Sequence, residues 1–289
     1  MANTNKEVFS LKGLQSLQRE VGLYQGQIDG LFGKGCVEGM RTLMSAFKPG
    51  SVPSLPNPSY NASDVFKYVQ SCLSVVGLYN SPLVVDGKWG SGSENAYRSL
   101  VDNYRNTKGL PNFGYAWSYH PNLTPENVAK VENWMNKWGK PLYHVSYLFS
   151  CFALETGRSF DPGILNPKSK AVGLIQFMPK TTAPDLGTTA EALAKMTVFE
   201  QLDYVFKYFE KYGYIKKCNR LEDYYLSIFY PAHVGKDPNT VVAKQGTTLY
   251  EQNKGFDADK KGFYTVGDIA YAITTFYWEG MDPKKRITL

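Results

Sequence analysis

Apolar residues recur at helical spacing along most of the chain. Two stripes of this kind lie in the first hundred residues: Leu11, Leu14, Leu17 and Val21, and then Val65, Val69, Leu73 and Val76. Three more follow within residues 202–209, 221–229 and 266–273. Residues three and four apart share one face of a helix, whereas the alternation typical of strands is scarce here. The pattern predicts a mainly α protein.

The first two stripes belong to an internal repeat. Three blocks recur in order: Gly22-Leu23-Tyr24 as Gly77-Leu78-Tyr79, Asp29-Gly30-Leu31-Phe32-Gly33 as Asp86-Gly87-Lys88-Trp89-Gly90, and Met40-Arg41-Thr42-Leu43 as Tyr97-Arg98-Ser99-Leu100. Each copy predicts a helix, a glycine turn and a second helix. A Pro/Ser-rich stretch over 49–59 separates the copies. We therefore expect one small repeat over residues 1–49 and another over 60–107.

An irregular, aromatic-rich stretch follows the repeats. It contains Gly109, Pro111, Gly114 and Pro121, which favour turns and loops. Thr124-Pro125 then has the form of a helix start, with threonine as N-cap and proline at the first helical position. We predict a linker over residues 108–123 and one mainly helical domain over 124–289.

Composition narrows the class of protein. Of 289 residues, 43% are apolar and 20% charged, so the chain has enough apolar residues to bury cores. The net charge of +6 is spread along the chain, and the clusters Lys216-Lys217 and Lys284-Lys285-Arg286 are short, so we expect no nucleic-acid partner. Four widely spaced cysteines indicate buried, reduced thiols. No apolar run is long enough to span a bilayer, and the polar start, Met1 to Phe9, predicts no signal peptide.

One carboxylate stands out in the second half. Val145, Leu148, Phe149 and Phe152 form an apolar helix face, and Glu155 follows three residues later at its edge. Loss of water disfavours the charged form of a carboxylate, so the pKa of Glu155 should rise. A carboxylic acid that is protonated near neutral pH can donate to a leaving oxygen, as glycosidic cleavage requires. The alternative is a surface carboxylate in the last helical turn.

The residues around Glu155 resemble a known family. Glu155-Thr156, Phe160-Asp161-Pro162 and Ala171-Val172-Gly173-Leu174-Ile175-Gln176-Phe177-Met178-Pro179 follow one another as in the lytic transglycosylases of the lysozyme superfamily. This resemblance implies a lysozyme-like, α-rich catalytic domain with Glu155 as acid and base. It implies substrate contacts from Thr156, Gly173, Leu174, Gln176 and Met178. Tyr230, in Tyr230-Pro231-Ala232-His233, corresponds to a family tyrosine beside the glutamate, although the family's asparagine and glycine are missing there.

The repeats resemble the small three-helix peptidoglycan-binding domain of cell-wall hydrolases. The resemblance implies wall contacts from Asp29, Phe32 and Arg41 and from their counterparts Asp86, Trp89 and Arg98. The alternative is that these residues only form turns and pack. The whole arrangement resembles modular phage endolysins, which implies synthesis in the host cytoplasm without a signal peptide, action at the wall after release, a monomer, and peptidoglycan glycan strands as partner.

A weaker motif lies further on. Asp257, Asp259 and Asp268 occupy positions 1, 3 and 12 of a calcium-type loop, with Gly262 at position 6. Lys261 at position 5 places a positive charge where a ligand is expected. We therefore favour a structural turn in which Asp268 caps the next helix, and we expect no metal and no cofactor.

Other chemistries fit less well. Zinc hydrolases need clustered histidines or cysteines, whereas His120, His144 and His233 lie far apart. Cys151 falls within the apolar helix, where a core thiol is expected. A hydrolytic lysozyme needs a second carboxylate or a positioned water, and Asp161 and Asp185 show no local sign of that role. A single-glutamate transglycosylase is favoured, with a hydrolytic lysozyme and a non-catalytic wall-binding or virion protein as alternatives.

Overall fold

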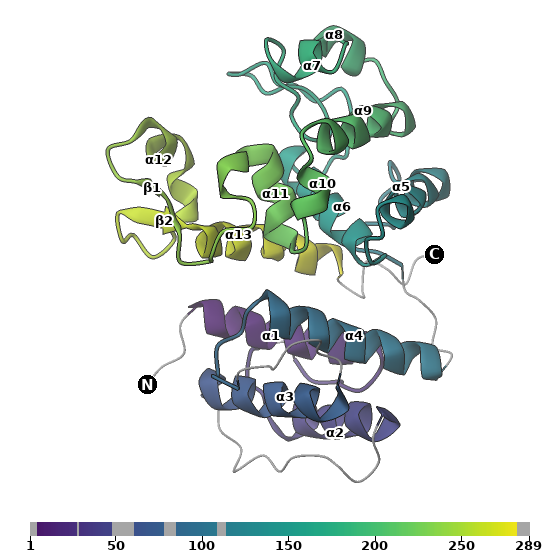
Figure 1. Ribbon diagram of the computed structural model, residues 1–289, viewed down its shortest axis with the longest axis vertical. Coiled ribbons are helices and arrows are strands. Elements are labelled where there is room, and N and C mark those ends of the chain that lie inside the picture. Colours follow the sequence, from purple (N-terminus) through teal and green to yellow (C-terminus); the bar gives the residue numbers. More distant parts are fainter. Residues whose placement is uncertain (1–4, 28, 48–60, 78–84, 109–113, 282–289) are drawn as a thin grey trace. The chain divides into compact units, whose positions relative to one another are not determined.

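The computed structural model describes residues 5–27, 29–47, 61–77, 85–108 and 114–281. The chain divides into two compact units, Met1–Phe113 and Gly114–Leu289, and each is described by itself. Both are built mainly of helices (Figure 1), so the predicted mainly α class is confirmed. None of the helices in the described ranges is long and apolar enough to cross a membrane.

The first unit contains four helices in its described residues: α1 (Asn5–Glu20), α2 (Lys34–Phe47), α3 (Ala62–Val76) and α4 (Ser91–Thr107). Each repeat contributes two of them in its described residues, as the helix–turn–helix pattern predicted, and a third helix of the kind that the resemblance implied is not among them. The helices of one repeat pack on those of the other: α1 contacts both α3 and α4, and α2 also contacts both α3 and α4. The two repeats thus build one shared core. The matching residues Leu78 and Tyr79 and the linker over 49–59 lie outside the described residues.

The second unit carries most of the elements. Its helices and strands are α5 (Pro125–Lys137), α6 (His144–Glu155), α7 (Thr182–Asp185), α8 (Ala190–Leu193), α9 (Val198–Lys211), α10 (Tyr214–Lys217), α11 (Leu221–Phe229), η1 (Pro231–His233), β1 (Val241–Lys244), α12 (Thr248–Asn253), η2 (Lys254–Phe256), β2 (Phe263–Thr265) and α13 (Val266–Gly280). The strands pair antiparallel, with Ala243 opposite Tyr264.

Helix α6 forms the centre of the second unit. Ten of its twelve residues, from His144 to Ala153, are buried. A helix that is apolar on all sides is stable only when other elements surround it, and α13, α11 and α5 pack against this one (Figure 1). Glu155 is its last residue, so the carboxylate lies at the boundary between the buried helix and the loop that follows it.

The second unit begins earlier than the sequence predicted. Tyr115, Trp117 and Leu123, within the expected linker 108–123, are buried in its core. The Trp117 backbone N–H donates to the Gly280 carbonyl at 3.1 Å, and its indole N–H donates to the Phe276 carbonyl at 2.9 Å. The stretch 114–123 therefore packs against the end of α13 as part of this unit. Tyr115 and Trp117, which the sequence placed in a linker, are core residues.

Candidate functional site

Glu155 is half-buried at the C-terminal end of α6. Desolvation by the surrounding side chains raises the pKa of its carboxyl to about 7. Burial disfavours the carboxylate because the charge loses its hydration, and burial is the cause of this shift. The upward shift expected from the sequence is thus confirmed. Near neutral pH the group is divided between its protonated and ionised forms, as a residue that gives and later takes a proton must be.

Tyr225 and Cys151 lie within electrostatic reach of Glu155. Burial raises the pKa of the Tyr225 phenol, and the Glu155 charge raises it further. The Cys151 thiol, one helical turn before Glu155, is also buried, and its pKa is raised by burial and then by Glu155. A thiol in such surroundings stays protonated and is a poor nucleophile. Cys151 is therefore a core residue, as expected.

Tyr230, the tyrosine predicted to accompany Glu155, has other neighbours. It caps the C-terminus of α11, and its ring stacks on His233 with centroids 5.0 Å apart. Burial, and then the nearby Tyr230 phenol, raise the pKa of Tyr264 to about 12. Tyr225, five residues earlier on α11, is the tyrosine whose pKa is raised by burial and then by the Glu155 charge. The sequence did contain this residue, but as part of the apolar stripe over 221–229.

Thr156 has a structural role rather than the predicted substrate contact. Its side chain is 1% exposed, which keeps it from a bound polymer. The hydroxyl donates to the Phe152 carbonyl at 2.7 Å and accepts from the Phe160 N–H at 3.0 Å. These two bonds join the last turn of α6 to the loop that follows.

The predicted cleft residues Gly173 and Leu174 are also buried. Gly173 has a φ of +78°, and a Cβ there would lie 2.2 Å from Oε1 of Gln201, so only glycine fits. The buried Gln201 amide accepts from the Leu174 N–H at 2.7 Å and donates to the carbonyls of Pro162, at 2.9 Å, and Leu193, at 3.0 Å. Gly173 and Leu174 are therefore buried residues that hold the segment in place, and the prediction that they contact saccharide is corrected.

Gln176 and Met178 are the two predicted cleft residues that reach the surface. Gln176 is half-buried and donates from Nε2 to the Gly173 carbonyl at 3.1 Å. Met178 is 41% exposed. Of the predicted substrate-binding set, these two are placed to touch a ligand.

Unfavourable backbone conformations gather in the same segment. Among the described residues, six other than glycine have positive φ, and four of them fall between positions 158 and 176: Arg158, Phe160, Lys170 and Gln176. Each such conformation costs free energy and persists only where the surrounding structure holds it. Strain of this kind is concentrated at functional sites, which singles out the loops after Glu155.

An ion pair holds the loop after Glu155 to α13. Nε of Arg158 donates to both carboxylate oxygens of Glu279, at 2.9 and 2.8 Å. The guanidinium also lies 4.4 Å from the centroid of the Phe276 ring. Nη2 of Arg158 also lies 2.7 Å from Oε2 of Glu279. Contact through two nitrogens fixes orientation as well as distance, so this pair restrains the chain three residues beyond the candidate acid.

The candidate second carboxylates have other partners. Asp185 accepts from Lys211 at 2.6 Å and from the Tyr212 hydroxyl. Oδ1 of Asp161 accepts from the Gly163 N–H at 2.8 Å and shapes its own turn. Neither is among the causes of the shifted pKa of Glu155.

Both repeat loops are held by a buried glutamine that the sequence comparison missed. Nε2 of Gln15 donates to Oδ1 of Asp29 at 2.9 Å and to the Leu31 carbonyl at 3.0 Å, while its Oε1 accepts from the Gly30 N–H at 2.8 Å. Gln70 makes the same three bonds to the second loop, at 3.2, 2.9 and 3.0 Å. Each aspartate also accepts from the backbone N–H two residues on. The main role of Asp29 and Asp86 in the structure is therefore to shape the loops.

The other predicted wall contacts are mostly core positions. Phe32 is 1% exposed and Arg98 is 5% exposed. Trp89 is half-buried, with its ring 5.2 Å from Phe66 and 6.2 Å from Tyr97 between centroids. Arg41 alone of these four is exposed. Packing explains Phe32, Trp89 and Arg98 better than contact with a polymer does.

The loop that resembles a calcium site is held by the protein's own donors. Asp257 accepts from the N–H groups of Lys261 and Gly262 and from the Tyr250 hydroxyl. The Lys261 ammonium lies 2.8 Å from Oδ2 of Asp268. Asp268 forms a capping box with Thr265 at the start of α13, which confirms the structural interpretation. No cluster of metal-ligating side chains is found in the part of the chain that the structure describes.

Comparison with known proteins does not assign the chain: no family model, no curated protein and no solved structure matches it.

Proposed function

We propose that this protein cleaves the β-1,4 glycosidic bond between N-acetylmuramic acid and N-acetylglucosamine in peptidoglycan. The observation that carries the proposal is the Glu155 carboxyl, half-buried at the end of α6 with a pKa of about 7. A general acid works best when its pKa lies near the working pH. The strained loops after it and the accessible Gln176 and Met178 give further support.

We favour the lytic transglycosylase reaction. Glu155 gives its proton to the glycosidic oxygen as the bond from that oxygen to C1 of N-acetylmuramic acid breaks. The resulting carboxylate takes a proton from the 6-hydroxyl of the same sugar, whose oxygen bonds to C1 and closes a 1,6-anhydro ring. One carboxyl serves both steps, which agrees with the engagement of Asp161 and Asp185 elsewhere. Hydrolysis of the same bond is the alternative, and it needs a positioned water.

The remaining residues receive supporting roles. Tyr225 lies within electrostatic reach of the Glu155 charge and would stand beside the reacting group. Gln176 and Met178 would contact sugar, and the Gln201 amide would position their segment. The repeats would hold the enzyme on the wall and raise its local concentration there. The biological role would be that of a phage endolysin, made in the host cytoplasm and acting on the wall during lysis.

The test is to incubate purified peptidoglycan with the protein and with Glu155→Gln, and to identify released muropeptides by mass spectrometry. Products that end in 1,6-anhydro-muramic acid, and that the variant does not form, would establish transglycosylation. Reducing-end products lost in the variant would establish the hydrolytic alternative. Binding to the wall without cleavage by either protein would leave the non-catalytic wall-binding alternative.

A further inference from the structure

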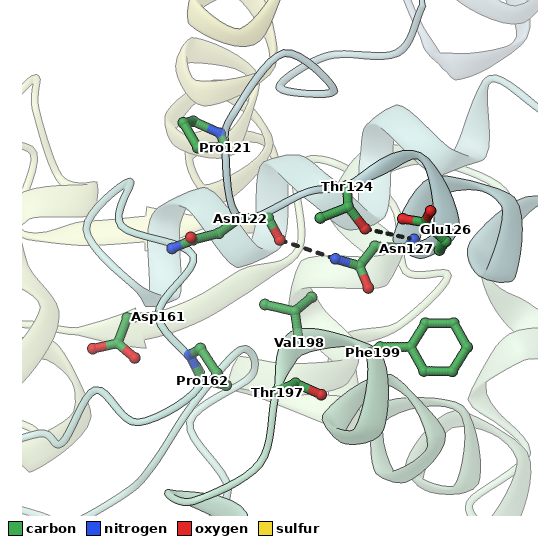
Figure 2. A pocket seen from close by; sticks show the side chains of 10 residues that line it. All are labelled: Pro121, Asn122, Thr124, Glu126, Asn127, Asp161, Pro162, Thr197, Val198 and Phe199. Atoms are coloured by element: carbon green, nitrogen blue, oxygen red, sulfur yellow. Dashed lines mark hydrogen bonds between the residues drawn. The ribbon is translucent and has the colours of Figure 1, made fainter.

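A pocket of about 670 Å³ lies in the second unit, and Glu155 is not among its lining residues. It is formed where the start of α5, the turn at Pro162 and the start of α9 meet (Figure 2). Val198, Phe199 and Pro162 supply apolar surface, and Asn127, Glu126 and Asp161 supply polar groups. Its size and its mainly apolar lining are those of a small-molecule site. We call it the α5–α9 pocket.

Asn127 contributes a buried acceptor that lacks a partner. The residue is 4% exposed. Its Nδ2 donates to the Asn122 carbonyl at 3.0 Å, which fixes the amide orientation because a flip would bring two oxygens together. Its Oδ1 is buried and accepts no hydrogen bond from any described residue. In Figure 2 this oxygen points away from Asn122, toward Val198 and Phe199. A buried acceptor without a donor costs free energy that a ligand donor would recover.

The polar groups of the pocket favour a donor over an anion. Glu126 and Asp161 are exposed at its rim, and a hydrogen bond from Thr124 lowers the pKa of Glu126, so this group is charged at neutral pH. The nearby cation, Lys130, is engaged: Nζ donates to the Phe199 carbonyl at 2.6 Å and pairs with Asp203 at 2.8 Å. Two carboxylates and an amide oxygen repel an anionic ligand and suit one that presents O–H or N–H groups.

The apolar side of the pocket suits a ring. Phe199 is 46% exposed, and Lys130 Nζ lies 3.8 Å from its ring centroid, which restrains the ring. A sugar presents C–H groups on one face and hydroxyl groups at its edge, so it can cover the Phe199 and Val198 side chains while donating to oxygen acceptors. An acetamido group adds an N–H donor, which matches the unpartnered amide oxygen of Asn127.

We propose that the α5–α9 pocket binds a neutral N-acetylated sugar, the N-acetylglucosamine unit of a glycan chain, with Asn127 Oδ1 as the acceptor for an N–H or O–H group of the sugar. The choice of sugar rests on the proposed function, whereas the choice of a neutral donor rests on the pocket alone. The carboxylates at the rim disfavour an N-acetylmuramic acid unit whose lactyl carboxylate is free of a stem peptide. The pocket would hold a glycan at a second position on the unit that carries Glu155.

The experiment uses the full chain with Glu155→Gln, so that binding is measured without turnover. The ¹⁵N-labelled protein is titrated with N-acetylglucosamine and with N,N′,N″-triacetylchitotriose, and amide shifts are followed by NMR. The proposal predicts shifts at Val198, Phe199 and the Asn127 side-chain amide. Adding Phe199→Ala or Asn127→Leu should raise Kd for the pocket at least fivefold. Leu142→Ala removes a similarly exposed apolar side chain outside the pocket and should leave Kd unchanged.

If Asn127→Leu fails to fold, the test rests on Phe199→Ala, because the Phe199 side chain lies at the surface and is not part of the core. Shifts confined to residues near Glu155 and Gln176, or no shifts at all, would overturn the proposal. Binding of protonated glucosamine in place of the N-acetylated sugar would also overturn it, because the pocket would then recognise a cation. Wall cleavage by the unmodified protein is assayed separately. Cleavage without sugar binding in the pocket would refute the proposed sugar site but leave the proposed enzymatic activity standing. Sugar binding in the pocket without cleavage would refute the enzymatic activity but leave the sugar site standing.

Discussion

Oε1 of Gln201 accepts a hydrogen bond from the backbone N–H of Leu174 at 2.7 Å. The same amide donates to the carbonyls of Pro162 and Leu193. One side chain on α9 therefore ties the Gly173–Gln176 segment to the turn that follows Glu155. The buried part of the motif keeps its shape through this amide, and the exposed part, Gln176 and Met178, takes its position from it.

Replacing Gln201 should destabilise the second unit. Gln201→Met keeps the volume but leaves the Leu174 N–H and the Pro162 carbonyl without partners, and each such group costs about 1–3 kcal/mol. We expect the free energy of unfolding to fall by about 3 kcal/mol in urea denaturation. Gln252→Met, at an exposed position of α12, is the matched control and should change it by less than about 0.5 kcal/mol. Equal stability of the two variants would contradict the role of Gln201.

The two repeat glutamines should be equivalent. Gln15→Met and Gln70→Met each remove three hydrogen bonds to an Asp-Gly loop, so each should cost the first unit about 2 kcal/mol. Amide hydrogen exchange in α1 and α3 of the full chain measures the loss. Gln25→Met, at an exposed position, is the control. A loss of protection in one repeat only would show that the two glutamines do not stabilise their loops equally in solution.

The sequence predicted those features that depend on local residues. The stripes gave the helices, Thr124-Pro125 gave the start of α5, and Asp268 was expected to cap α13. The raised pKa of Glu155 was predictable for the same reason, because Glu155 follows the apolar positions of its own helix at the end of α6.

The features that the sequence did not predict depend on contacts across the fold. Gln201 lies 27 residues after Leu174, and no periodicity connects them. The repeat glutamines stand 14 residues before Asp29 and 16 before Asp86, so a comparison in a single register does not align them. Glycine and proline residues on either side of Trp117 are typical of a linker. Only its hydrogen bonds to α13 show that it occupies a core position.

The pKa of Glu155 predicts how stability depends on pH. The folded pKa of about 7 exceeds its ordinary value of 4.5, so the stabilisation of the protonated form is fully present below about pH 4.5 and is lost as pH rises through 7. Between these limits the protein should lose on the order of 3 kcal/mol relative to Glu155→Gln. Urea unfolding of both proteins from pH 4 to 8 measures the difference.

Glu191→Gln is the control for this titration. Glu191 lies exposed in the first turn of α8, and its pKa is lowered rather than raised. Its replacement should leave the fall in stability between pH 4.5 and 7 intact. If the stability difference between the unmodified protein and Glu155→Gln stays constant over that range, Glu155 does not titrate near 7.

Calcium should have no effect on the Asp257–Asp268 loop. The carboxylates already accept from Lys261, Gly262 and Tyr250, so neither added calcium nor a chelator should move Tm. Asp268→Asn should lower the free energy of unfolding by about 1 kcal/mol, because it weakens the α13 capping box and the Lys261 ion pair. A rise in Tm with calcium that Asp268→Asn abolishes would instead identify a metal site.

If Glu155 gives the proton that breaks the glycosidic bond, the rate at which labelled fragments are released from purified peptidoglycan depends on its carboxyl. Loss of a general acid typically lowers a rate by about 10²–10⁴-fold. We expect a loss of that size in Glu155→Gln, an unchanged rate in Glu191→Gln, and a decline in the unmodified protein's rate as pH rises above 7. Release by Glu155→Gln at the rate of the unmodified protein would show that Glu155 is not the general acid.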